Sequence, residues 1–108
     1  MKYILLLLSL FMLAGCQANT IKSDETHIKL KEDADIYLEG TSIFIEEGMT
    51  VSDVISFIES MDGSKQSYSG VSNDRTPKQK EEFYQYEYLL VTSESGNYRQ
   101  YYAIIFIE

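Results

Sequence analysis

The sequence predicts an α+β domain in which one helix packs on a mostly antiparallel β-sheet, in a β-grasp-like or sandwich-like arrangement. Apolar residues recur at three- and four-residue spacing only in segment 49–61, which predicts a single amphipathic helix. Two runs rich in tyrosine and β-branched residues, 83–93 and 98–108, predict an antiparallel hairpin. A signal peptide and a flexible tether are predicted to precede this domain.

Three short strands are predicted before the helix and one after it. Apolar alternation within 27–38 predicts two strands around an acidic turn, and the apolar run 43–45 predicts a third. Segment 66–72 has a weaker strand pattern. Segment 73–82 is polar, charged and contains the single proline, so we expect a solvated loop there.

The helix is predicted to begin at a capping box. Thr50 is suited to accept hydrogen bonds from the first backbone N–H groups, and Asp53 lies three residues further on. Gly63 is predicted to end the helix, because glycine readily adopts the left-handed conformation that follows a helix. The predicted helix therefore covers 49–61.

The hairpin is predicted to pair Ser93 with Tyr98 across a four-residue loop. Alternation then places one set of side chains on one face: Tyr84, Tyr86, Tyr88, Leu90, Tyr101, Ala103, Ile105 and Ile107. The opposite face carries Phe83, Leu89, Val91, Tyr102, Ile104 and Phe106. The last strand is apolar on both faces near its end, which predicts a central position in the sheet.

The N-terminus has the three parts of a secretory signal. Lys2 supplies the positive charge, 4–13 is an apolar run interrupted by one serine, and Ala14 and Gly15 are small enough for signal peptidase. The run is shorter than the ~20 apolar residues that span a bilayer. Residues 1–15 are therefore predicted to be a signal peptide.

Leu13-Ala14-Gly15-Cys16 resembles the lipobox of bacterial lipoproteins at all four positions, and Cys16 is the single cysteine of the chain. The resemblance implies that Cys16 becomes the lipidated first residue, anchored at the extracytoplasmic face of the cell membrane, or in an outer membrane where the host has one. A diacylglyceryl group buries two acyl chains at ~0.8 kcal/mol per methylene, which suffices for stable anchoring. The alternatives are an ordinary secretory signal with a chance cysteine and a buried N-terminal helix.

The domain division follows from composition. Residues 16–26 are predicted to be the lipidated cysteine and a polar tether, and residues 27–108 one small α+β domain. The chain has 9 basic and 17 acidic side chains, a formal charge of −8, and loss of Lys2 makes it one unit more negative. This charge disfavours binding to nucleic acid and a domain that lies flat on anionic lipid.

The helix region is similar to a module of bacterial cell-surface and S-layer-associated proteins with the pattern Gly-x-Thr-Val-x-Asp-Leu. Matching positions are Gly48-Met49-Thr50-Val51-Ser52-Asp53-Val54, Asp62-Gly63-Ser64, Leu89-Leu90-Val91-Thr92-Ser93-Glu94-Ser95-Gly96 and Tyr102-Ala103-Ile104. The resemblance implies a helix laid on a mostly antiparallel sheet. A charged loop replaces the module's Gly-rich hairpin between Val71 and Phe83, so the strand order around 66–83 stays open.

A shorter resemblance is to small envelope lipoproteins of the SmpA/OmlA kind. It rests on the lipobox, the size and a Gly-Met-Thr-x-x-x-Val helix start, read here at Gly48, Met49, Thr50 and Val54. The Leu-Gly-x-Pro that follows in that family is replaced by residues 58–61. The resemblance implies an accessory role in envelope assembly.

No catalytic grouping is recognisable in the sequence. His27 is the single histidine and has no partner fixed by spacing, so we expect an exposed strand residue. The acidic clusters lack the Asp-x-Asp-x-Asp-Gly spacing of a calcium loop, and no serine stands in a Gly-x-Ser-x-Gly elbow. The sequence predicts that the protein is not an enzyme and uses no cofactor or metal.

Tyrosines of the hairpin supply the one candidate binding surface. Tyrosine offers a large rigid contact area with an orienting hydroxyl, which suits recognition of a protein or glycan of the envelope. The candidate residues are Tyr84, Tyr86, Tyr88 and Tyr101. The alternative is that these rings form cross-strand pairs that stabilise a half-exposed sheet.

Taken together, these patterns predict a lipid-anchored lipoprotein with a small non-catalytic binding or spacer domain. Two alternatives remain open. One is an accessory of envelope assembly, and the other is an inhibitor or immunity-type protein that acts on an envelope enzyme.

Overall fold

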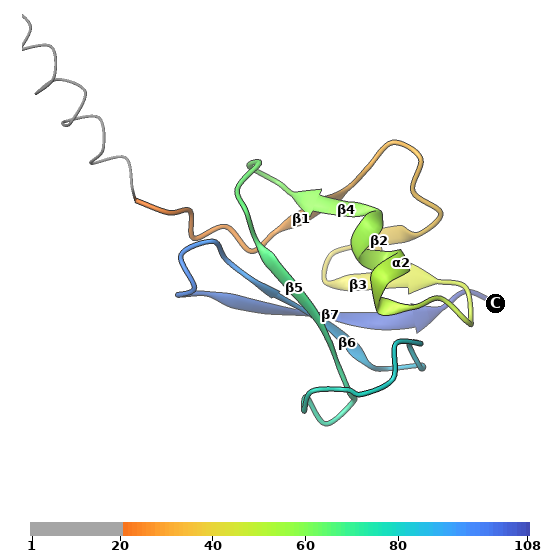
Figure 1. Ribbon diagram of the computed structural model, residues 1–108. Coiled ribbons are helices and arrows are strands. Elements are labelled where there is room, and N and C mark those ends of the chain that lie inside the picture. Colours follow the sequence, from red (N-terminus) through yellow and green to blue (C-terminus); the bar gives the residue numbers. More distant parts are fainter. Residues whose placement is uncertain (1–20) are drawn as a thin grey trace, which may run out of the picture.

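The computed structural model describes residues 21–108, so the predicted signal peptide and Cys16 lie outside the described residues. In chain order the elements are β1 (Ile28–Leu30), β2 (Tyr37–Glu39), β3 (Ser42–Ile45), α2 (Val51–Ser56), β4 (Ile58–Ser60), β5 (Ser67–Val71), β6 (Tyr88–Thr92) and β7 (Arg99–Phe106) (Figure 1).

The strands form two sheets. The larger has the order β2-β3-β7-β6-β5, and its neighbours are antiparallel except for the parallel pair β3 and β7. The smaller sheet pairs β1 with β4. Helix α2 and the small sheet lie on the same side of the large sheet (Figure 1). One short helix and mostly antiparallel sheets are present as predicted, and the central position of the last strand is confirmed.

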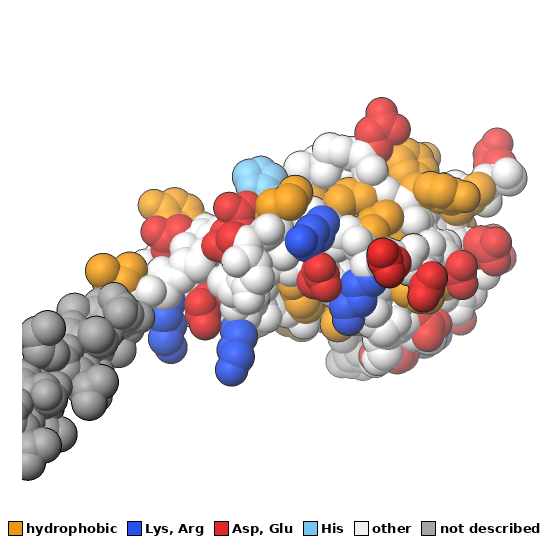
Figure 2. Space-filling view, turned by 90° about the horizontal axis from the view of Figure 1, so that it is seen from above, with side chains coloured by type: hydrophobic (Ala, Val, Ile, Leu, Met, Phe, Trp, Pro, Cys, Tyr) orange, Lys and Arg blue, Asp and Glu red, His pale blue; other side chains and the backbone are white. Residues whose placement is uncertain are grey.

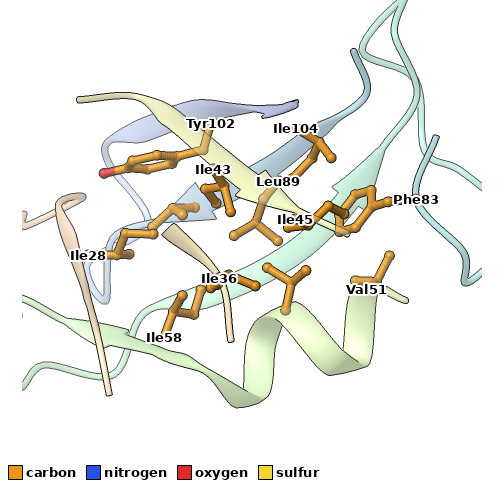
Figure 3. Close-up of a cluster of buried hydrophobic side chains, with 12 residues drawn as sticks. Ile28, Ile36, Ile43, Ile45, Val51, Ile58, Phe83, Leu89, Tyr102 and Ile104 are labelled. Carbon is orange, nitrogen blue, oxygen red and sulfur yellow. The ribbon is translucent and has the colours of Figure 1, made fainter. Parts of the chain in front are cut away.

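The core lies between the large sheet and the layer formed by α2 and the small sheet (Figure 3). Each layer contributes buried apolar side chains. The large sheet supplies Ile43, Ile45, Leu89, Val91, Tyr102 and Ile104, and the opposing segments supply Ile28, Ile36, Val51, Val54, Ile58 and Phe83. Only one face of the large sheet is therefore used by the core.

The helix begins where the sequence predicts it. The Thr50 side chain accepts a hydrogen bond from the backbone N–H of Asp53, and the Asp53 carboxylate accepts one from the backbone N–H of Thr50, each at 3.1 Å. This reciprocal capping box satisfies two backbone donors that the first turn leaves open.

The predicted extension of the helix to residue 61 is wrong. The helix ends at Ser56, and β4 follows almost at once. Ile58 pairs with Leu30 and is 3% exposed, so extended pairing with β1 buries this β-branched side chain as effectively as a helix would. Gly63 does not end the helix and instead has a φ of +80° in the turn after β4.

The hairpin has the predicted register but a shorter first strand. The backbone N–H of Ser93 donates to the carbonyl of Tyr98, as expected. Before β6, the backbone N–H of Tyr86 donates to the carbonyl of Ile104, and the N–H of Ile104 donates to the carbonyl of Glu87. Tyr86 and Glu87 therefore both lie opposite Ile104, which is a β-bulge. Tyr86 adopts a φ of +67° at this bulge.

The segment predicted to be a flexible tether contacts the domain from Ser23 onward. The Ser23 hydroxyl donates to the Asp62 carboxylate (2.6 Å), and its carbonyl accepts from the backbone N–H of Ser95 (3.0 Å). The Tyr102 hydroxyl donates to the carbonyl of Thr26 (3.1 Å). Hydrogen bonds from Ser23 and neighbouring serines hold the pKa of Asp62 well below its usual range. These contacts join the N-terminal segment to two turns of the domain.

Candidate functional site

The face of the large sheet that points away from the core carries a cluster of partly exposed apolar side chains. Three of its residue pairs face one another across neighbouring strands: Phe44 and Ile105, Tyr88 and Ala103, and Leu90 and Tyr101. All six side chains are partly exposed, and no described helix or strand covers them (Figure 1). We call these six residues the open face.

The local sequence explains why this face is apolar. In an antiparallel sheet with one side in water, outward positions are normally polar. Strand β7 instead alternates buried Tyr102 and Ile104 with outward Tyr101, Ala103 and Ile105. Apolar side chains that gather on an outward face are typical of an interaction site.

A cation lies on the aromatic end of the open face. The rings of Tyr88 and Tyr101 meet edge to face, with centroids 5.8 Å apart and an interplanar angle of 76°. The guanidinium carbon of Arg75 lies 5.3 Å from the Tyr88 centroid and 4.8 Å from the Tyr101 centroid. Both distances fit a cation–π contact, so Arg75 and the two rings form one cluster.

Arg75 is positioned by a tight loop between β5 and β6. Its φ is +68°, which is uncommon for a residue with a side chain. The Asp74 carboxylate accepts hydrogen bonds from the hydroxyls of Ser72 and Thr76 and from the backbone N–H of Thr76. These bonds favour the ionised carboxylate and lower the pKa of Asp74 to about 2.

The four predicted tyrosines do not form one surface. Tyr88 and Tyr101 lie together on the open face, whereas Tyr84 and Tyr86 lie in the irregular segment before β6 and are 45% and 62% exposed. The sequence prediction of a straight strand from residue 83 is wrong because the bulge interrupts the alternation. The sequence pattern does not identify Arg75 as part of this site, because only the folded loop places its guanidinium over the Tyr88 and Tyr101 rings.

Beside this site, Lys78 and Glu87 form a second side-chain cluster in the segment between β5 and β6. The Lys78 ammonium lies 3.4 Å from the Glu87 carboxylate, and the two side chains are 5% and 11% exposed. Lys78 also donates to the carbonyls of Lys80 and Glu82. The sequence predicts a solvated loop here, but the Lys78 side chain is buried. It links the backbone of residues 78–82 to Glu87 in the bulge.

The remaining sequence candidates show no site of their own. His27 is exposed, and its Nδ1 lies 2.7 Å from a carboxylate oxygen of Glu25. Within residues 21–108, no three histidine, cysteine, aspartate or glutamate side chains are grouped closely enough to hold a metal ion. The same part of the chain contains no helix that is long and apolar enough to cross a membrane.

Comparisons of the chain with protein-family models, with curated proteins and with solved structures gave no match. The resemblances to the lipobox, to the cell-surface module and to the SmpA/OmlA-type lipoproteins therefore stay predictions that rest on the residues quoted for them.

Proposed function

We propose that this protein is a lipid-anchored extracytoplasmic lipoprotein whose domain binds a protein of the cell envelope through the open face and carries out no catalysis. The observation that carries the binding role is the apolar open face, which no described helix or strand covers and which only the Arg75 loop overlaps at one end. Burial of such a surface by a partner removes apolar area from water, which is the main favourable contribution to protein association.

A protein suits the open face better than a glycan. Sugar rings stack on flat, unobstructed aromatic faces, whereas Tyr88 and Tyr101 stand edge to face and share the Arg75 guanidinium. The rest of the face is aliphatic or phenylalanine, which favours protein side chains. The chain has a formal charge of −8, so a partner with basic residues around an apolar centre is complementary to it.

The lipid anchor is supported by the N-terminal sequence. With Cys16 lipidated, six residues separate it from Ser23, where contacts with the domain begin. Six extended residues reach about 20 Å, so the domain would stay close to the bilayer. Of the two predicted arrangements we favour the β-grasp-like one, because one helix lies on one side of a mixed sheet in which β3 and β7 are parallel.

The anchor is tested by metabolic labelling with radioactive palmitate. We expect wild-type protein to incorporate label and to sediment with membranes, and Cys16→Ala to lose both properties, because the thiol is the acylated group. Ser23→Ala, which changes the tether but leaves the lipobox intact, serves as the control. Equal labelling of Cys16→Ala and wild type would contradict the lipoprotein assignment.

The open face also bears on the alternatives. A pure spacer needs no exposed apolar surface, so it leaves this face unexplained. An accessory of envelope assembly or an inhibitor of an envelope enzyme would each use a protein partner, and both are forms of the binding role proposed here.

A further inference from the structure

A groove lies at the end of the domain that carries the C-terminus. It is lined by Ala34, Asp35, Tyr37, Glu46, Met49 and Ile107 and encloses about 450 Å³. Ile107 forms part of the wall, and its backbone N–H donates to the carbonyl of Ile45 (2.8 Å). In Figure 1 this end lies opposite the entry of residues 21–26, so a membrane anchor leaves it accessible.

The groove has a mainly polar, negatively charged lining that also includes the side chains of Tyr37, Met49 and Ile107. Tyr37 is 66% exposed and Ile107 is 39% exposed, so two large apolar side chains stand at the opening. The carboxylates of Asp35 and Glu46 have no ion-pair partner among residues 21–108. Figure 2 shows further acidic side chains towards the same end of the domain, where few basic ones lie. The local field is therefore negative and uncompensated.

This combination matches the chemistry of a basic side chain. Lysine and arginine carry a cationic head on an aliphatic stem and bury the stem along apolar surface. The stem would lie on Met49 and Ile107, and the cation would lie between the carboxylates of Asp35 and Glu46. The exposed ring of Tyr37 adds an aromatic surface for a cation–π contact.

We propose that the groove binds a lysine or arginine side chain of the partner protein. The inference rests on the proposed function only in taking the partner to be a protein. Tyr37 is the cross-strand neighbour of Phe44, an open-face residue, so the groove and the open face are adjacent. One partner with a basic residue beside an apolar surface would thus contact both.

The groove is tested by NMR on the full chain, purified in non-ionic detergent and labelled at the methionine methyl groups. The probe is the peptide acetyl-Gly-Lys-Gly-amide, compared with its norleucine analogue, which keeps the aliphatic stem and lacks the charge. We expect a saturable shift of the Met49 methyl with the lysine peptide and no shift of Met61, which is exposed outside the groove. The norleucine peptide should bind about ten-fold more weakly.

A charge-matched pair of variants separates the groove from general attraction to an acidic protein. Asp35→Asn with Glu46→Gln should weaken binding of the lysine peptide about ten-fold. Glu32→Gln with Asp33→Asn removes the same charge from exposed positions outside the groove lining and should change it little. Equal binding of the norleucine peptide, or equal losses in the two variants, overturns the groove proposal. The proposed function is tested by a different experiment, which detects contact of the partner with the open face. Its failure can therefore be told apart from failure of the groove proposal.

Discussion

Replacement of Lys78 by methionine is expected to lower the free energy of unfolding by about 3 kcal/mol, because it leaves the Glu87 carboxylate buried without its cation. Lys78 and Glu87 are 5% and 11% exposed, so water does little to replace the lost ammonium. The carbonyls of Lys80 and Glu82 also lose their donor. Guanidinium unfolding of the full chain, followed by circular dichroism, measures the change.

Lys80→Met is the matched control for Lys78→Met. Lys80 lies in the same loop but is exposed, and its removal should change the unfolding free energy by less than about 0.5 kcal/mol. A double variant, Lys78→Met with Glu87→Gln, should recover part of the loss, because no full charge is then buried. Equal stabilities of Lys78→Met and Lys80→Met would contradict a buried ion pair.

Leu89→Ala is expected to cost about 3 kcal/mol of unfolding free energy, whereas Leu90→Ala should cost less than about 1 kcal/mol. The two residues are adjacent on β6 and point to opposite faces of the sheet. Leu89 is fully buried against the helix layer, and truncation there leaves a cavity. Leu90 is partly exposed on the open face, where water fills the space.

The pair Leu89→Ala and Leu90→Ala compares the same chemical change on the two faces, measured by the same guanidinium titration. Comparable large losses would mean that a further layer covers the open face. In that case Leu90 would belong to a second core, and the binding proposal would lose its surface.

Local patterns were sufficient to predict much of the fold. From residue 88 onward, alternation in the hairpin predicted its register and its two faces, because shifting the pairing by one residue would turn every buried side chain to the other face. The capping box at Thr50 and Asp53 predicted the start of the helix, because its hydrogen bonds span only three residues. Two apolar faces predicted the central place of β7.

Features that depend on distant partners were not predictable in this way. Ile58 fits the helical spacing of segment 49–61, and only its pairing with β1 makes it a strand residue. The parallel pairing of β3 with β7 joins segments far apart in the chain. Arg75 and Lys78 read as loop charges, and their contacts with the Tyr88 ring and with Glu87 appear only when the loop is folded.

The central claim is that the open face binds a protein partner at the membrane. A photo-crosslinking amino acid placed at Leu90 in the lipidated chain, and separately at Glu59 on the opposite side of the domain, tests it in living cells. We predict one discrete crosslinked adduct from position 90, absent from position 59 and lost when Ala103→Arg is added to obstruct the open face. No adduct at position 90, or the same adducts at both positions, would contradict the account.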